Sequence, residues 1–275
     1  MHNKLQIENI NSFSIHIKKE NDIADAVANR IVPHIHDTCE IYVNLTGNVS
    51  FMVEKNIYPI QHGDIIITRP YEYHHCILND NSDHFHYWLL FSSNENPTLF
   101  NAFYNRARGV NNLIRLPEKL KNRFLELCEQ TLLMPKTKKI EIMANFFEML
   151  SYIEAGTVEN NIPNINNTLP EDINEILTYI NKNYSTIKTI NDVADKFHIS
   201  IATLERRFKT YLYISPKKYL TNKKLSYACR LLRQNYSATN ACFESGFTDF
   251  SHFIAVFKKF FGTTPLKYKK EHFSK

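Results

Sequence analysis

The sequence predicts an α+β protein of two domains, in which an N-terminal β-barrel with helices precedes a C-terminal all-α domain. The chain has 275 residues, which exceeds the ~100 to 200 residues of one domain. Short apolar segments with strand-like alternation gather between residues 31 and 91, and helical periodicity dominates from residue 101 onward. Charge divides in the same way, because residues 1–170 carry 15 Lys and Arg against 19 Asp and Glu, whereas residues 171–275 carry 18 against 9. The net charges of −4 and +9 predict a basic, polyanion-binding C-terminal domain.

Composition excludes several classes of protein. The chain is 43% hydrophobic and 22% charged, which is typical of a folded protein. Its five cysteines are scattered and form no CxxC pair, so neither a disulfide framework nor a cysteine zinc site is expected. The N-terminus lacks a secretory signal, and no apolar run approaches the ~18 residues of a membrane span. We therefore expect a cytoplasmic protein with no membrane partner.

The N-terminal domain is expected to begin with closely spaced strands. The segments EIYVNL, NVSFMV, GDIIIT and HFHYWLLF are β-rich, and turn signals lie at 47–48, 62–64 and 79–83. Strands at this spacing predict a sandwich or small barrel. Helical periodicity follows over residues 101–155, and we expect the helices of residues 117–155 to form a homodimer interface.

An Asn-rich segment without periodicity separates the two domains. It has the sequence GTVENNIPNINNTLP, over residues 156–170. The expected organisation is a first domain at 1–160, a linker at 161–170, and a basic domain at 171–275.

The basic C-terminal segment contains an internal repeat. A shift of 49 residues brings RRFKTYLYISPKKY (206–219) over AVFKKFFGTTPLKY (255–268), with matching Phe, Lys, Ser/Thr-Pro and Lys-Tyr positions. In the first copy, Thr189 and Asp192 have the spacing of a capping box, His198-Ile199 marks a short turn, and Ser200 can cap a second helix. In the second copy, Gly246 marks the turn and Asp249 the cap. Each copy therefore predicts a helix-turn-helix unit.

A helix over residues 216–234 is expected to separate the two units. At 1.5 Å per residue it would be ~28 Å long. A spacer of this length can hold two recognition helices about one turn of B-DNA, ~34 Å, apart. Both helices could then enter successive major grooves on one side of the duplex.

Residues 172–270 resemble the DNA-binding domain of the AraC/XylS family of transcription regulators. The resemblance rests on SIATLERRFK, the SPKKY after it, ACRLL in the spacer, and SGFTDFSHFIAVFKKFFGTTPLKY. It implies seven helices and promoter DNA as partner, and it assigns base reading to Ala202, Glu205 and Arg206 and to Ser251, His252 and Ala255. With the neighbouring polar and basic positions, the expected DNA-binding residues are Ala202, Thr203, Glu205, Arg206, Lys209, Ser251, His252, Ala255, Lys258 and Lys259.

The second recognition helix departs from the family pattern. Ala255 stands where an arginine is usual, and the core of the preceding helix is thinned to Ala241, Cys242 and Ser245. Arg206 can contact guanine with both arms, whereas Ala255 offers only an apolar contact. We therefore expect the first unit to carry most of the sequence specificity.

The N-terminal histidines resemble the two cupin motifs, and AraC-type regulators often have a cupin-like barrel at this end. His34, His36 and Glu40 fit the first motif, while His75 fits the second. The second match is weaker, because Glu72 replaces a glycine and a shift of one residue would align His74 in place of His75. In other cupins these positions bind iron, manganese or zinc.

Three interpretations of these residues stay open. They could line a small-molecule pocket, bind a metal ion, or have no special role. Because His34, His36, Glu40, Tyr42 and Asn44 all have even numbers, one unbroken strand would place them on a single polar face. The expected effector-binding residues are His34, His36, Glu40, Tyr42, Tyr71, Tyr73, His75 and Trp88.

Taken together, these patterns predict a transcription regulator and not an enzyme. Its expected partners are double-stranded promoter DNA, a small-molecule effector such as a sugar, a second copy of the chain and RNA polymerase, and no cofactor is expected. The alternative is a metal-dependent cupin enzyme or metal sensor fused to a DNA-binding domain. An activator is expected.

Overall fold

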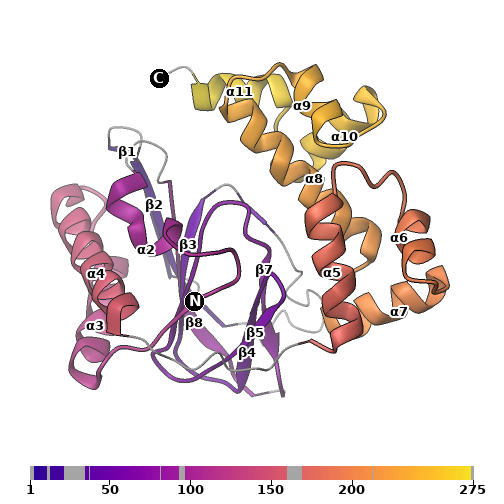
Figure 1. Cartoon of the computed structure of the whole chain (residues 1–275). Helices are drawn as coiled ribbons and strands as arrows, with labels where there is room; N and C mark the ends of the chain where they lie inside the picture. Colours follow the sequence, from indigo (N-terminus) through magenta and orange to yellow (C-terminus); the bar gives the residue numbers. More distant parts are fainter. Residues whose placement is uncertain are drawn as a thin grey trace. The chain divides into compact units, whose positions relative to one another are not determined.

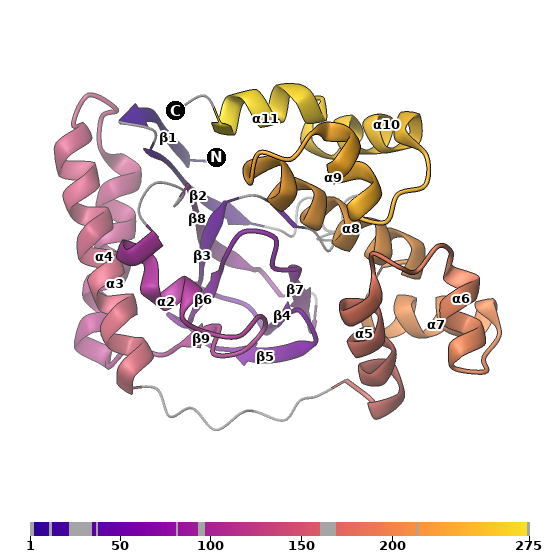
Figure 2. The same ribbon diagram turned by 45° about the horizontal axis from the view of Figure 1, so that its top comes forward.

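The computed structural model divides the chain into two compact units, residues Met1–Thr168 and Leu169–Lys275. It describes residues 3–10, 13–21, 35–36, 38–80, 82–92, 97–159, 169–212 and 214–273. Figure 1 and Figure 2 show the first unit as strands flanked by helices and the second as helices alone. This agrees with the α+β fold class expected from the sequence. No helix in the described part of the chain is both long and apolar enough to cross a membrane.

Two antiparallel sheets form the N-terminal unit. The larger sheet contains, in spatial order, β1 (Asn3–Ile10), β2 (Phe13–Asn21), β8 (Phe85–Phe91), β3 (Cys39–Asn44), β6 (Ile65–Thr68) and β9 (Leu113–Ile114). The smaller sheet contains β5 (Asn56–Ile60), β4 (Val49–Val53) and β7 (His74–Leu78). The four segments expected to be strands all lie in this framework, which confirms that part of the prediction.

Both faces of the large sheet are buried, and alternation along each strand decides which residue faces which side. Ile41 and Val43 on β3 join Leu89 on β8 in a core beneath the helices. Tyr42 lies between them and packs with Phe51 of the smaller sheet in a second core. Glu40 and Tyr42 of β3 therefore face the space between the sheets. However, β3 begins at Cys39, so His36 precedes the strand instead of sharing it, as the expected unbroken strand would require.

Helices cover the outer face of the large sheet. Short η1 (Pro97–Phe100) and α2 (Asn101–Tyr104) precede the antiparallel pair α3 (Glu118–Leu133) and α4 (Lys139–Glu159), which lie side by side against the sheet (Figures 1 and 2). Phe124, Leu127 and Phe146 are almost fully buried under this layer. Helix α4 continues through Gly156, so the first residues of the Asn-rich segment are helical.

The C-terminal unit has seven helices within residues 169–273. They are α5 (Glu171–Asn183), α6 (Ile190–Lys196), α7 (Ile201–Leu212), α8 (Pro216–Arg233), α9 (Ala238–Glu244), α10 (Phe250–Phe261) and α11 (Pro265–Phe273). Helix α8 joins α5–α7 to α9–α11, and both views show these two groups at opposite ends of it (Figures 1 and 2). With 18 residues, α8 is ~27 Å long at 1.5 Å per residue.

Candidate functional sites

The two helix-turn-helix units have the caps and turns that the sequence predicts. Thr189 and Asp192 form a complete capping box at α6. The side chain of Asp249 accepts a hydrogen bond from the His252 backbone N–H at 2.5 Å, which caps α10. The two turns differ in residue type but share a left-handed backbone, with φ of 52° at His198 and 88° at Gly246.

Helices α7 and α10 present most of their predicted DNA-binding side chains to solvent. Each helix buries one apolar face, on which Leu204 and Phe208 in α7 and Phe253 and Phe257 in α10 are 0% exposed. The exposed predicted residues are Ala202, Glu205, Arg206, Lys209, Ser251, His252, Ala255, Lys258 and Lys259. This exposure leaves both faces available to a DNA groove.

Thr203 is the exception among the predicted DNA-binding residues. Its side chain is half-buried at the start of α7, where its Oγ1 lies 2.9 Å from the Ser200 Oγ. The Ser200 hydroxyl also accepts the Thr203 backbone N–H at 3.1 Å, so it caps α7 as expected. Thr203 therefore belongs to the helix N-terminus.

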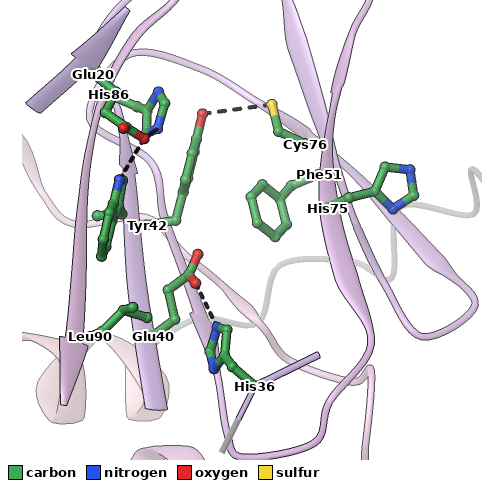
Figure 3. A pocket seen from close by; sticks show the side chains of 10 residues that line it. Glu20, His36, Glu40, Tyr42, Phe51, His75, Cys76, His86 and Leu90 are labelled. Atoms are coloured by element: carbon green, nitrogen blue, oxygen red, sulfur yellow. Dashed lines mark hydrogen bonds and ion pairs between the residues drawn. The ribbon is translucent and has the colours of Figure 1, made fainter. Parts of the chain in front are cut away.

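A cavity of about 260 Å³ lies between the two sheets of the N-terminal unit. Figure 3 shows its wall, which combines carboxylates and imidazoles with aromatic and apolar groups. The lining residues are Glu20, His36, Glu40, Tyr42, Phe51, His75, Cys76, His86, Trp88 and Leu90. Five of them, His36, Glu40, Tyr42, His75 and Trp88, are among the residues that the sequence singled out.

Glu40 is at the centre of the polar part of the cavity. Its Oε2 lies 2.8 Å from His36 Nε2 and 3.4 Å from His74 Nε2 (Figure 3 draws the first contact). Burial raises the pKa of Glu40, but the charge of His74 and the hydrogen bonds from both imidazoles outweigh burial and bring the pKa well below its ordinary value. Burial lowers the pKa of His74, but Glu40 overcomes this and raises it. The cavity wall therefore carries an ionised carboxylate.

His74, and not His75, is the histidine that reaches Glu40. Residues alternate between the faces of β7, so His74 and Cys76 face the larger sheet while the ring of His75 points away from Glu40 in Figure 3. The second cupin motif therefore aligns with the shift of one residue. His34 lies outside the described residues.

Tyr71 and Tyr73 were expected in the pocket, but neither lines the cavity. Tyr71 has a φ of 61° in the turn before β7, where its backbone N–H donates to the His36 carbonyl at 2.8 Å. Tyr73 is 0% exposed and packs against the ring of His75 instead. Tyr71 is therefore a turn residue, and Tyr73 is a core residue.

Several cavity residues were missed by sequence reasoning, although strand alternation carried the signal. His86 and Leu90 were missed, although each is two residues from the predicted Trp88 along β8. Trp88 pairs directly with Tyr42 across the sheet. Glu20 is on β2, which precedes the region that the sequence analysis expected to form strands. Its carboxylate accepts a hydrogen bond from Trp88 Nε1 at 2.6 Å. The alternation of Phe13, Ile15 and Ile17 could have revealed this strand.

Glu72, the departure from the cupin pattern, has a structural explanation. Its carboxylate is 0% exposed and accepts hydrogen bonds from both arms of Arg106, at 2.8 and 2.6 Å. The backbone N–H of Gly109 adds a third bond at 2.6 Å. Burial raises the pKa of Glu72, but the hydrogen bonds and charge of Arg106 outweigh it and lower the pKa to about 2. Glu72 thus fixes the loop before β9 to the turn before β7.

Comparison with known proteins agrees with this architecture. Residues 23–135 match the AraC-like ligand binding domain, and residues 193–271 match a helix-turn-helix domain. The chain belongs to the AraC/XylS family of transcription regulators. It is a DNA-binding regulator with an N-terminal ligand-binding domain, as the sequence resemblance implied.

Individual relatives of this AraC-family regulator are distant. The HTH-type transcriptional activator RhaS of Escherichia coli K12 is 24% identical over 259 residues, covering 84% of this chain and 85% of RhaS. Unsaturated fatty acid bound ToxT from Vibrio cholerae is 14% identical, with a TM-score of 0.38 over 96% of each chain. A Listeria innocua protein of unknown function is 31% identical over 36% of this chain and 96% of its own, with a TM-score of 0.35.

Proposed function

We propose that the cavity of the N-terminal unit binds a neutral, hydroxyl-rich effector such as a sugar, and that this binding controls how the C-terminal unit engages promoter DNA. The observation that carries the proposal is the ionised Glu40 carboxylate in a wall that also holds Trp88 and Phe51. Carboxylates accept strong hydrogen bonds from hydroxyl groups, and aromatic rings pack against the C–H faces of a sugar.

Charge and size narrow the effector further. Glu20 and Glu40 both line the cavity, so an anionic ligand would be repelled by two carboxylates. A volume of about 260 Å³ is below the ~300 to 1,000 Å³ of sites for drug-sized ligands. A single sugar ring matches this space better than a long lipid chain.

The fluorescence of Trp88 gives a direct test, because it is the only tryptophan of the chain and lines the cavity. A panel of monosaccharides, fatty acids and aromatic acids is titrated into the full-length protein. A sugar is expected to change Trp88 emission and to stabilise the N-terminal unit, by ~2.7 kcal/mol at 100 times its Kd.

Glu40→Gln is expected to weaken that binding at least tenfold, because the charged acceptor is lost. Glu141→Gln removes the same charge from an exposed position of α4, outside the cavity, and serves as the matched control. The opposite outcome is that fatty acids bind more tightly than any sugar and that Glu40→Gln strengthens their binding. This outcome would show that the effector is an anion and not a sugar.

A metal ion is the second candidate ligand, because one nitrogen each of His36 and His74 and one Glu40 oxygen lie within 4.8 Å of one another. In both histidines Nδ1 is near a backbone carbonyl, at 3.0 Å from Thr38 O and 2.6 Å from Glu72 O. Such bonds orient Nε2 toward a metal. Two imidazoles and a carboxylate suit zinc, iron or manganese, which would make the protein a metal sensor or metal-dependent enzyme.

Metal analysis separates the two candidates. A metal sensor should retain or bind one zinc, iron or manganese ion per chain, and His36→Ala should abolish this binding. Sugar binding without stoichiometric metal would assign the cavity to an organic effector.

We further propose that the chain forms a homodimer through α3 and α4. Three large apolar side chains are exposed there, Leu133 at 64%, Ile140 at 83% and Phe147 at 42%. Ile140 and Phe147 are seven residues apart and so share one side of α4. In sedimentation, Ile140→Lys should shift the protein toward monomer, and an unchanged dimer would exclude this face. On promoter DNA, we propose that the dimer activates transcription by contacting RNA polymerase.

A further inference from the structure

Helix α8 carries a buried lysine, Lys224, whose side chain joins two distant backbone segments. The residue is 6% exposed. Its ammonium donates one hydrogen bond to the Ile187 carbonyl at 2.7 Å and another to the Gly246 carbonyl at 2.8 Å. Both of these partners are uncharged carbonyls and not carboxylates.

The two carbonyls belong to different helix-turn-helix units. Ile187 is in the segment between α5 and α6, two residues before the Thr189 cap of the first unit. Gly246 is in the turn between α9 and α10 of the second unit, directly before the recognition helix and its Asp249 cap. Lys224 therefore connects the spacer helix α8 to the segment before α6 in the first unit and to the turn before α10 in the second unit.

A second observation shows that the two helix-turn-helix units touch at this point. A Cβ added to Gly246 would lie 2.3 Å from the Ser185 carbonyl oxygen, so only glycine allows this approach of the two backbones. The positive φ of Gly246, 88°, also favours glycine. At Gly246 the two helix-turn-helix units therefore approach each other through backbone atoms.

Burying the charged ammonium of Lys224 costs free energy, although it holds this contact together. Burial lowers the pKa of Lys224, which reflects the cost of removing an ammonium from water. The charge of Asp192 raises the pKa without outweighing burial, and the Phe247 ring, 6.0 Å from Nζ, adds weak compensation. Apolar side chains of similar volume often give equal or greater stability than buried charges. Hydrogen bonds add direction, however, and so can fix a relative orientation that apolar packing leaves looser.

We propose that Lys224 is a positioning residue, which fixes recognition helices α7 and α10 at one separation and orientation through Ile187 and Gly246. Its consequence is a strict preference for one spacing between the two DNA half-sites. Adding one base pair moves a half-site by ~3.4 Å and rotates it by about a tenth of a turn. Two recognition helices held at one separation and orientation cannot adjust to that change.

The test uses full-length protein and half-sites selected from random duplexes with the wild-type chain. Affinity is measured with the selected spacing and with one base pair inserted or deleted. We expect the wild type to lose at least tenfold in affinity at the wrong spacings. Lys224→Met should lose affinity at the best spacing but change less than threefold between spacings, and Lys224→Arg should restore much of the preference.

Lys223→Met is the matched control, since it removes the same charge from the next residue of α8, where Lys223 is half-buried over the Tyr219 ring. It should keep the wild-type spacing preference. If Lys224→Met does not unfold cooperatively, Lys224→Gln takes its place. Sharp spacing preference in the Lys224 variant overturns the proposal. Failure of both variants to fold also overturns it, because Lys224 would then be needed for the fold itself.

Discussion

The candidate sites of the two units place their charged side chains in opposite ways. In the N-terminal unit, Glu40, Glu72 and the guanidinium of Arg106 are buried and paired. In the C-terminal unit, Arg206 and Lys258 are exposed on the recognition helices. Buried pairs fix the geometry of a cavity, whereas exposed cations remain free to meet phosphates and bases.

The physical setting explains why this difference matters. A charge pair in the interior is barely screened by salt and becomes costly if one member is removed. An exposed cation costs little to keep and exchanges its counterions when DNA binds. Mutations in the two units should therefore differ in kind, with stability affected in one and DNA affinity in the other.

The largest expected effect comes from breaking the buried pair in the N-terminal unit. Arg106→Met leaves the Glu72 carboxylate buried without its main partner, and should destabilise this unit by ~3 to 5 kcal/mol. Urea unfolding followed by Trp88 fluorescence measures it. Exposed Arg108, whose hydrogen bonds go to backbone carbonyls, is the control, and Arg108→Met should cost ~1 kcal/mol. Equal losses in the two variants would contradict a special role for the pair.

A smaller effect is expected from the first recognition helix. Arg206→Ala should lose ~1 to 3 kcal/mol of discrimination at one base position, because a two-armed contact to guanine is removed. Selection from random duplexes measures this loss, with His252→Ala in the second unit as the comparison. If Arg206→Ala kept the sequence preference while His252→Ala destroyed it, the assignment of specificity to the first unit would be reversed.

The smallest expected effect concerns phosphate contacts of the second recognition helix. Lys258→Ala should weaken binding about equally for all sequences and reduce the slope of log K against log salt by about 1. Binding titrations across a salt series measure this slope. Lys182→Ala on α5 removes an exposed lysine outside the recognition helices and should leave the slope unchanged. A loss confined to one sequence would instead indicate base reading by Lys258.

Much of the C-terminal unit could be predicted from the sequence because its signals are local. The capping box of Thr189 and Asp192 and the Asp249 cap involve residues three apart. The stripe of Leu204 and Phe208 repeats at helical spacing. Ser245, predicted as part of a thinned core, is indeed 0% exposed. Such patterns do not depend on how distant segments pair.

The cavity was predicted less completely because its residues come together through strand pairing. Alternation placed Glu40 and Tyr42 on one face, but the choice of His74 over His75 depends on the register of β7 against β4. A one-residue change of register would exchange the two histidines between faces.

The sequence by itself determined the two domains, the duplicated DNA-binding unit and its exposed basic helices, since charge and periodicity are properties of neighbouring residues. Only the tertiary structure decided which groups meet Glu40, why Glu72 is tolerated opposite Arg106, and which carbonyls the ammonium of Lys224 binds. These contacts join residues 34, 34, 37 and 22 positions apart along the chain. Their geometry depends on packing and strand register, which residue type and local spacing do not specify.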